Sequence, residues 1–147
     1  MNQYLHNLAK EILHNEPNGL SKVRFAKTIY FVHKGLVKKE LIQSDAMRFI
    51  RMPLGPVPVG FKELHADSGI IVKITTSSLS YNTETYLLKT YKEYFDRLHK
   101  EAISSLVDKL KNISTSELVE ISHQEPSWFS NGNGSEFYIS KRDLKQY

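Results

Sequence analysis

Histidine, serine and carboxylate side chains are the groups in this chain that could perform catalysis or hold a metal ion. Six histidines are present, at His6, His14, His33, His65, His99 and His123. No two of them lie three to five residues apart and no His-Glu-x-x-His motif occurs, so their spacing predicts no metal site. No serine stands in a Gly-x-Ser-x-Gly elbow, and the chain has no cysteine. We therefore expect no catalytic residue, no metal and no cofactor, and a protein that binds a partner rather than an enzyme.

His123 is the histidine whose neighbours most favour a chemical role, because it ends an apolar helix pattern shortly before Trp128. In one interpretation it is a ligand or general base beside an aromatic wall. In the other it lies at a helix C-terminus, where it binds a carbonyl and is stabilised by the helix dipole. Trp128, the only tryptophan, is either a binding anchor or part of the core. An enzyme that uses His123 or His33 stays an alternative hypothesis.

The least ordinary stretch of the chain is the proline segment, which we define as Met52-Pro53-Leu54-Gly55-Pro56-Val57-Pro58. Its three prolines fix φ, remove three backbone donors and push the preceding residues toward extended geometry. Gly55 permits a positive φ or a close backbone approach. We predict a stiff bend that cannot lie inside a sheet, and whose carbonyls must meet water, side chains or a partner. Such a bend is either a rigid corner or a binding surface.

Helical periodicity predicts the elements that position these residues. Apolar residues from Leu5 to Leu13 recur with the spacing of an amphipathic helix. Ser21 is the expected N-cap of a second helix. That helix carries Val23, Phe25, Ala26, Ile29, Tyr30, Phe31 and Val32, so it is apolar around most of its circumference and should lie in the middle of the domain.

The second half of the chain predicts one hairpin and several helices. Residues Ile70–Thr76 and Thr83–Leu88 read as paired strands, with Ser77–Asn82 as the turn. Apolar residues from Tyr91 to Ile113 predict a helix of about six turns. Ser114 and Glu117 form a capping-box pattern ahead of a short helix. Further short elements are expected, namely an extended piece at Met47–Arg51, a helical turn at Phe61–His65 with Pro58 near its start, an extended piece at Phe137–Ile139 and a helical turn capped by Ser140.

Positive charge is concentrated in the first half of the chain. Residues 1–65 contain ten Lys or Arg and five Asp or Glu, whereas the remainder is close to neutral. One hypothesis is therefore a nucleic-acid-binding module that uses Lys22, Arg24, Lys27, Lys34, Lys38 and Lys39. Arg24 and Lys27 interrupt the apolar face of the second helix, which predicts that both project outward. The alternative is a solvated helix face, and a helix with so broad an apolar surface is poorly exposed for a major groove.

Bulk composition predicts a single globular domain over residues 1–147. The chain is 40% hydrophobic and 24% charged, with a formal net charge of +4. It has no basic and apolar leader and no apolar run near the roughly 20 residues that span a bilayer. Together with the absence of cysteine, these features favour a cytoplasmic protein without a membrane partner. The expected fold class is mainly α with a small β-hairpin, packed around one buried central helix.

Three blocks of sequence, in order, resemble the SocA-like Panacea antitoxin domain. The first comprises Gly19-Leu20-Ser21-Lys22 and Lys27-Thr28-Ile29-Tyr30-Phe31-Val32-His33. The second runs from Arg48 to Pro58 and is similar to the family's extended segment ending in Tyr-Gly-Pro-Val. The third is Leu118-Val119-Glu120-Ile121-Ser122-His123 followed by Trp128. The resemblance spans most of the chain.

This resemblance implies a phage-associated type of protein from a toxin–antitoxin system, which binds and neutralises a toxin encoded beside it. It also implies presentation of that toxin to a protease as a further role. The matching motif residues Tyr30, Met52, Leu54, Gly55, Pro56, Val57, Pro58, His123 and Trp128 are the candidate partner-binding positions. Leu54 departs from the family pattern, because tyrosine usually stands there. The toxin's identity and the oligomeric state do not follow from the resemblance.

Overall fold

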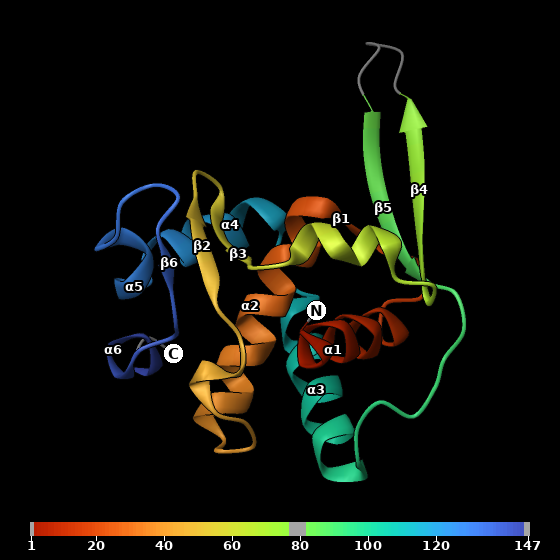
Figure 1. The fold of residues 1–147 in the computed structure, drawn as a ribbon, viewed down its shortest axis with the longest axis horizontal. Helices are drawn as coiled ribbons and strands as arrows, with labels where there is room; N and C mark the ends of the chain where they lie inside the picture. The colour runs from red at the N-terminus through yellow and green to blue at the C-terminus, as the bar shows by residue number, and fades with distance from the viewer. Residues whose placement is uncertain (1, 77–81, 146–147) are drawn as a thin grey trace.

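Helix α2 (Lys22–Lys38) runs through the centre of the molecule, as the apolar pattern predicts (Figure 1). The structure is a computed structural model that describes residues 2–76 and 82–145. Helices α1 (Gln3–His14) and α3 (Arg97–Leu110) pack against α2. Phe25, Ile29 and Tyr30 are completely buried in the core that these helices enclose. None of the helices in the described ranges is long and apolar enough to cross a bilayer.

The first three-stranded sheet contains the predicted hairpin. Strand β4 (Ile70–Thr76) pairs antiparallel with β5 (Asn82–Leu88), and β5 pairs in turn with the short strand β1 (Leu20–Ser21). Tyr86 of β5 is fully buried at the base of this sheet, whereas the far ends of β4 and β5 project away from the helices (Figure 1). Most of the predicted turn lies outside the described residues.

The second three-stranded sheet contains the proline segment, and here our expectation that the segment avoids a sheet is wrong. Strands β2 (Phe49–Met52) and β3 (Gly55–Pro58) form a hairpin with Pro53 and Leu54 as its loop, and β6 (Glu136–Phe137) pairs with the other side of β2. The strand order β3-β2-β6 places β3 at an edge. An edge strand tolerates prolines because the N–H groups that they lack can face away from the neighbouring strand.

The register explains how β3 accommodates two prolines. The backbone N–H of Arg51 donates to the Ser135 carbonyl at 2.9 Å and the Arg51 carbonyl accepts from Gly134 at 2.8 Å, so both groups face away from β3. Pro56 is opposite Arg51 and therefore occupies a pair without hydrogen bonds between β2 and β3. Pro58 lies two residues on and shares this orientation. Their missing N–H groups would point out of the sheet, so no ladder bond is lost.

The predicted N-caps locate the starts of the helices more accurately than the predicted apolar periodicities do. Ser21, Ser114 and Ser140 are N-caps of α2, α4 (Thr115–His123) and α6 (Lys141–Leu144). Short 3-10 helices lie at Ser44–Ala46 (η1) and Phe61–Ala66 (η2), and α5 is Pro126–Phe129. The cap of η2 is Gly60, so Pro58 ends a strand and does not begin a helix.

Helix α3 begins at Arg97, and the prediction that it begins at Tyr91 is wrong. The Asp96 carboxylate accepts a hydrogen bond from the His99 backbone N–H at 3.0 Å and caps the helix there. The residues before Asp96 instead lie along α1. The Tyr91 ring stacks on His14 with centroids 3.8 Å apart, and its hydroxyl donates to Glu11 at 3.1 Å. The aromatic residues before Asp96 recur with a helix-like spacing although they are not helical, because they pack along the outside of α1.

Candidate functional site

Three backbone carbonyls of the proline segment accept hydrogen bonds from side chains on other elements. Trp128 Nε1 donates to the Met52 carbonyl at 3.0 Å, and Lys27 Nζ donates to the Pro56 carbonyl at 2.9 Å. His123 Nε2 lies 2.9 Å from the Pro53 carbonyl. The free carbonyls expected from the sequence therefore meet side chains of the same protein. We call β2, β3 and their loop, held in this way, the anchored hairpin.

Gly55 allows the hairpin to approach α2 and α4 closely. Its φ is +112°, in the region that side chains other than glycine rarely adopt. A Cβ built at this position would lie 2.3 Å from Ser122 Oγ and 2.7 Å from Lys27 Cε. The backbone conformation and the lack of space both require glycine, so the structure shows both the positive φ and the close approach that the sequence allowed at Gly55.

His123 and Trp128 form one layered cluster beside the hairpin. Their rings stack with centroids 4.2 Å apart and an interplanar angle of 21°. The Arg51 guanidinium carbon lies 4.1 Å from the Trp128 ring, and Arg51 Nη1 donates to the Asn131 carbonyl. A carbonyl only accepts, so the proton on His123 resides on Nε2. This geometry favours the interpretation that His123 binds a carbonyl, which belongs to Pro53 rather than to its own helix.

Lys27 is buried, and the prediction that it projects outward is wrong. Only 1% of Lys27 is exposed, and burial lowers the pKa of its ammonium group to about 8. Its stem crosses the narrow space beside Gly55 and its charge is directed at the Pro56 carbonyl. Arg24 is half-buried, and its guanidinium donates to the Leu110 carbonyl at 2.7 Å. Both cations are thus occupied with intramolecular contacts.

Lys34 and Tyr30 meet at a buried carboxylate. Lys34 Nζ and the Tyr30 hydroxyl donate to Glu125 Oε1 at 2.5 Å and 2.8 Å. Burial raises the pKa of Glu125, and the hydrogen bond from Lys34 opposes that shift. Tyr30 is completely buried, so its hydroxyl is a structural group between α2 and α5. Among the cations proposed for nucleic acid, Lys22, Lys38 and Lys39 are exposed.

The other candidate positions divide between buried and exposed. Gly55, Pro56 and Pro58 are buried and Val57 is half-buried. Met52 and Leu54 are exposed, at 42% and 53%, on either side of Pro53. The departure from the family's tyrosine thus falls at the exposed tip of the anchored hairpin. The sequence did not single out Phe129, which follows Trp128 and is 52% exposed.

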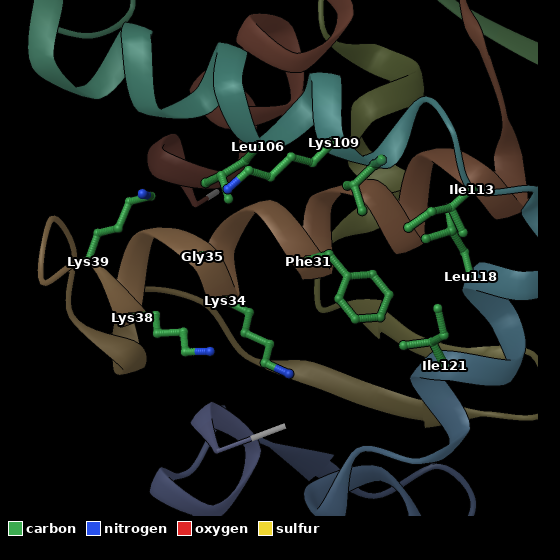
Figure 2. A pocket seen from close by; sticks show the side chains of 11 residues that line it. Phe31, Lys34, Gly35, Lys38, Lys39, Leu106, Lys109, Ile113, Leu118 and Ile121 are labelled. Carbon is green, nitrogen blue, oxygen red and sulfur yellow. The ribbon is translucent and has the colours of Figure 1, made fainter. Parts of the chain in front are cut away.

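A groove between α2, α3 and α4 is the feature that sequence reasoning missed (Figure 2). It encloses about 550 Å³. Its lining is apolar and basic, and consists of Phe31, Lys34, Gly35, Lys38, Lys39, Leu106, Lys109, Leu110, Ile113, Leu118 and Ile121. We call it the lysine groove. The sequence showed only that Phe31 is one of the apolar residues of α2, and the structure adds that other elements cover Phe31 only in part.

The described residues contain no group of three or more His, Asp or Glu side chains that could hold a metal ion. Two surface features remain as candidate sites, namely the tip of the anchored hairpin and the lysine groove. Helix α4 connects them, because Ser122 and His123 face the hairpin while Leu118 and Ile121 line the groove.

Comparison with protein families shows which family this chain resembles. Residues 25–129 match the family described as antitoxin SocA-like, Panacea domain. The matched stretch includes all three side chains that anchor the hairpin and all the residues that line the lysine groove. Neither the curated proteins nor the solved structures include a match to this chain.

Proposed function

Since this chain belongs to the SocA-like Panacea antitoxin family, we propose that it binds and neutralises a toxin protein encoded beside it. The observation that carries the proposal is the match over more than two thirds of the chain. In this proposal the protein acts by binding in the cytoplasm and not by catalysis. Presentation of the bound toxin to a cellular protease is a further step of the same proposal.

The contacts of the polar motif residues support a binding role. Lys27 and His123 are directed at carbonyls of the anchored hairpin, and Tyr30 is directed at Glu125. Each of these groups fixes one element against another, as expected when a motif maintains the shape of a surface. Met52 and Leu54 remain exposed on the surface that results.

The test is co-expression with the adjacent reading frame. We expect that frame to stop growth when induced alone, growth to recover when this protein is present, and the two proteins to co-purify. A frame that is harmless alone, or toxicity that this protein does not change, would contradict the proposal. A Leu54→Asp variant probes the hairpin tip, with Tyr138→Asp as the control because Tyr138 is similarly exposed elsewhere.

The protease step needs a separate measurement. If the protein presents the toxin to a protease, the toxin's half-life should shorten on co-expression and lengthen again in a host that lacks the protease. If neutralisation is by binding alone, the toxin's half-life stays the same or increases while growth recovers.

A further inference from the structure

We propose that the lysine groove is the docking site for an acidic, amphipathic helix of the toxin. This inference rests on the proposed function and specifies the chemistry of the partner. It places the recognition of the partner on α2, α3 and α4 and not on the hairpin tip alone.

The floor of the lysine groove is apolar and incompletely covered. Phe31, Leu106 and Ile121 are among the apolar residues that line it, and all three are half-buried. Figure 2 shows Phe31, Leu118 and Ile121 from α2 and α4 pointing toward one another at one end of the groove. Covering an apolar surface of this kind is the main favourable term in most associations between proteins.

The polar part of the groove carries one sign of charge. Lys34, Lys38 and Lys39 come from the end of α2, and Lys109 comes from α3 (Figure 2). Among the described residues, no aspartate or glutamate lines the groove. Lys34 is buried against Glu125, whereas Lys38, Lys39 and Lys109 form no ion pair within residues 2–76 and 82–145. A partner that matches this surface presents carboxylates beside apolar side chains.

A helix fits this combination better than a nucleic acid or an extended peptide. The walls of the groove are helices, and helix surfaces receive another helix by packing ridges into grooves. A helix places apolar residues at i, i+3 and i+4 along one face, which matches the floor, and acidic residues on the flank, which matches the lysines. Nucleic acid would satisfy the lysines but would leave the apolar floor uncovered.

Charge reversal tests the lysines. The variant Lys38→Glu/Lys109→Glu alters two exposed lysines of the groove and leaves the buried Lys34 in place. The control Lys73→Glu/Lys141→Glu makes the same change of charge at exposed positions outside the groove. We expect the groove variant to bind the purified toxin about tenfold or more weakly, which corresponds to about 1.4 kcal/mol. The control should bind as tightly as the wild type, and the wild type should bind more weakly as salt is raised.

Photo-crosslinking locates the contact in a protein with all lysines intact. A photoreactive phenylalanine analogue at Ile121 lies in the groove, and the same analogue at the exposed Ile74 of β4 is the control. We expect crosslinks from position 121 to an acidic helix of the toxin. Replacing the acidic residues of that helix with lysine should restore binding to the Lys38→Glu/Lys109→Glu variant.

Several outcomes would overturn the inference while the proposed function stands. One is a groove variant that binds the toxin as tightly as its control. Another is crosslinking from position 121 to a segment without acidic residues, to nucleic acid or to a second copy of this chain. No crosslink in a complex that forms normally would also overturn it. If the wild type itself neither binds nor neutralises the toxin, the proposed function has failed instead.

Discussion

At the scale of single residues, Gly55 shows how backbone freedom determines the shape of a surface. The sequence placed a glycine between two prolines and so predicted a permissive backbone position. The structure adds that Ser122 and Lys27 occupy the space that a side chain would need. Gly55 thus allows β3 to lie against α2 and α4, next to the exposed Leu54 and Met52.

Gly55→Val should lower the free energy of unfolding by about 3 kcal/mol, since it combines a strained φ with a steric clash. Gly134→Val is the matched control. Gly134 also has a positive φ, of +80°, but has no atom within 4 Å of a built Cβ. Gly134→Val should lower the free energy of unfolding by about 1 kcal/mol, because it introduces backbone strain without a clash. Chemical denaturation measures both, and equal losses would contradict the steric part of the argument.

At the scale of elements, the anchored hairpin depends on side chains as well as on its own ladder. Two-stranded hairpins are marginally stable by themselves. Here β6 supports one side of β2, and Trp128, His123 and Lys27 bind carbonyls at the end of β2, in the loop and in β3, respectively. The three sequence blocks that resemble the family are far apart along the chain. In the structure, Lys27, His123 and Trp128 bring them together at the anchored hairpin.

Trp128→Phe should keep an aromatic ring against His123 and Arg51 but remove the donor to the Met52 carbonyl. We expect a loss of about 1 kcal/mol in the free energy of unfolding, because one hydrogen bond of a nearly buried group is lost. Amide hydrogen exchange in β2 and β3 should quicken more than exchange in α1. Tyr138→Phe, at an exposed aromatic residue, serves as the control and should change neither quantity. Uniform acceleration of exchange in every element would count against a local role.

Elements that depend on neighbouring residues were predicted correctly, whereas elements that depend on distant contacts were not. N-caps at Ser21, Ser114 and Ser140 were identified correctly because a cap depends on residues within one turn. The start of α3 was misplaced because Tyr91 and its neighbours pack on α1 from a distant part of the chain. The prediction excluded the proline segment from a sheet because the sequence does not show which strands pair. Only the strand order β3-β2-β6 reveals that β3 lies at an edge, where its prolines are tolerated.

At the scale of the whole molecule, His33 connects three segments. Its Nδ1 lies 2.8 Å from the Tyr4 hydroxyl of α1, and its Nε2 lies 3.3 Å from the Ser44 carbonyl. A neutral ring that donates from Nε2 and accepts at Nδ1 satisfies both contacts. Burial lowers the pKa of His33 to about 4. Its protonation is therefore linked to unfolding.

Stability should fall on acidification because of His33. Between pH 6.5 and about 4 the unfolded chain carries a proton on this ring that the folded chain lacks, so the free energy of unfolding decreases as pH falls. The full effect is about 3 kcal/mol. His33→Gln removes the titration, so the stability advantage of the wild type should shrink by about this amount from pH 7.5 to 4. A difference between the two proteins that does not change with pH would contradict the prediction.

The sequence by itself determined the central apolar helix, the capping residues, the β4–β5 hairpin and the family. These features depend on spacing within a few residues or on residue identity along the chain. Only the tertiary structure decided that Lys27 and Lys34 are buried, that the proline segment is an edge strand and that a groove lies between α2, α3 and α4. Each depends on residues that are not neighbours in the sequence, such as Lys27 and Pro56, which are separated by 29 positions. Local periodicity cannot specify which carbonyl a distant side chain meets, because that choice is made when the helices and strands pack together.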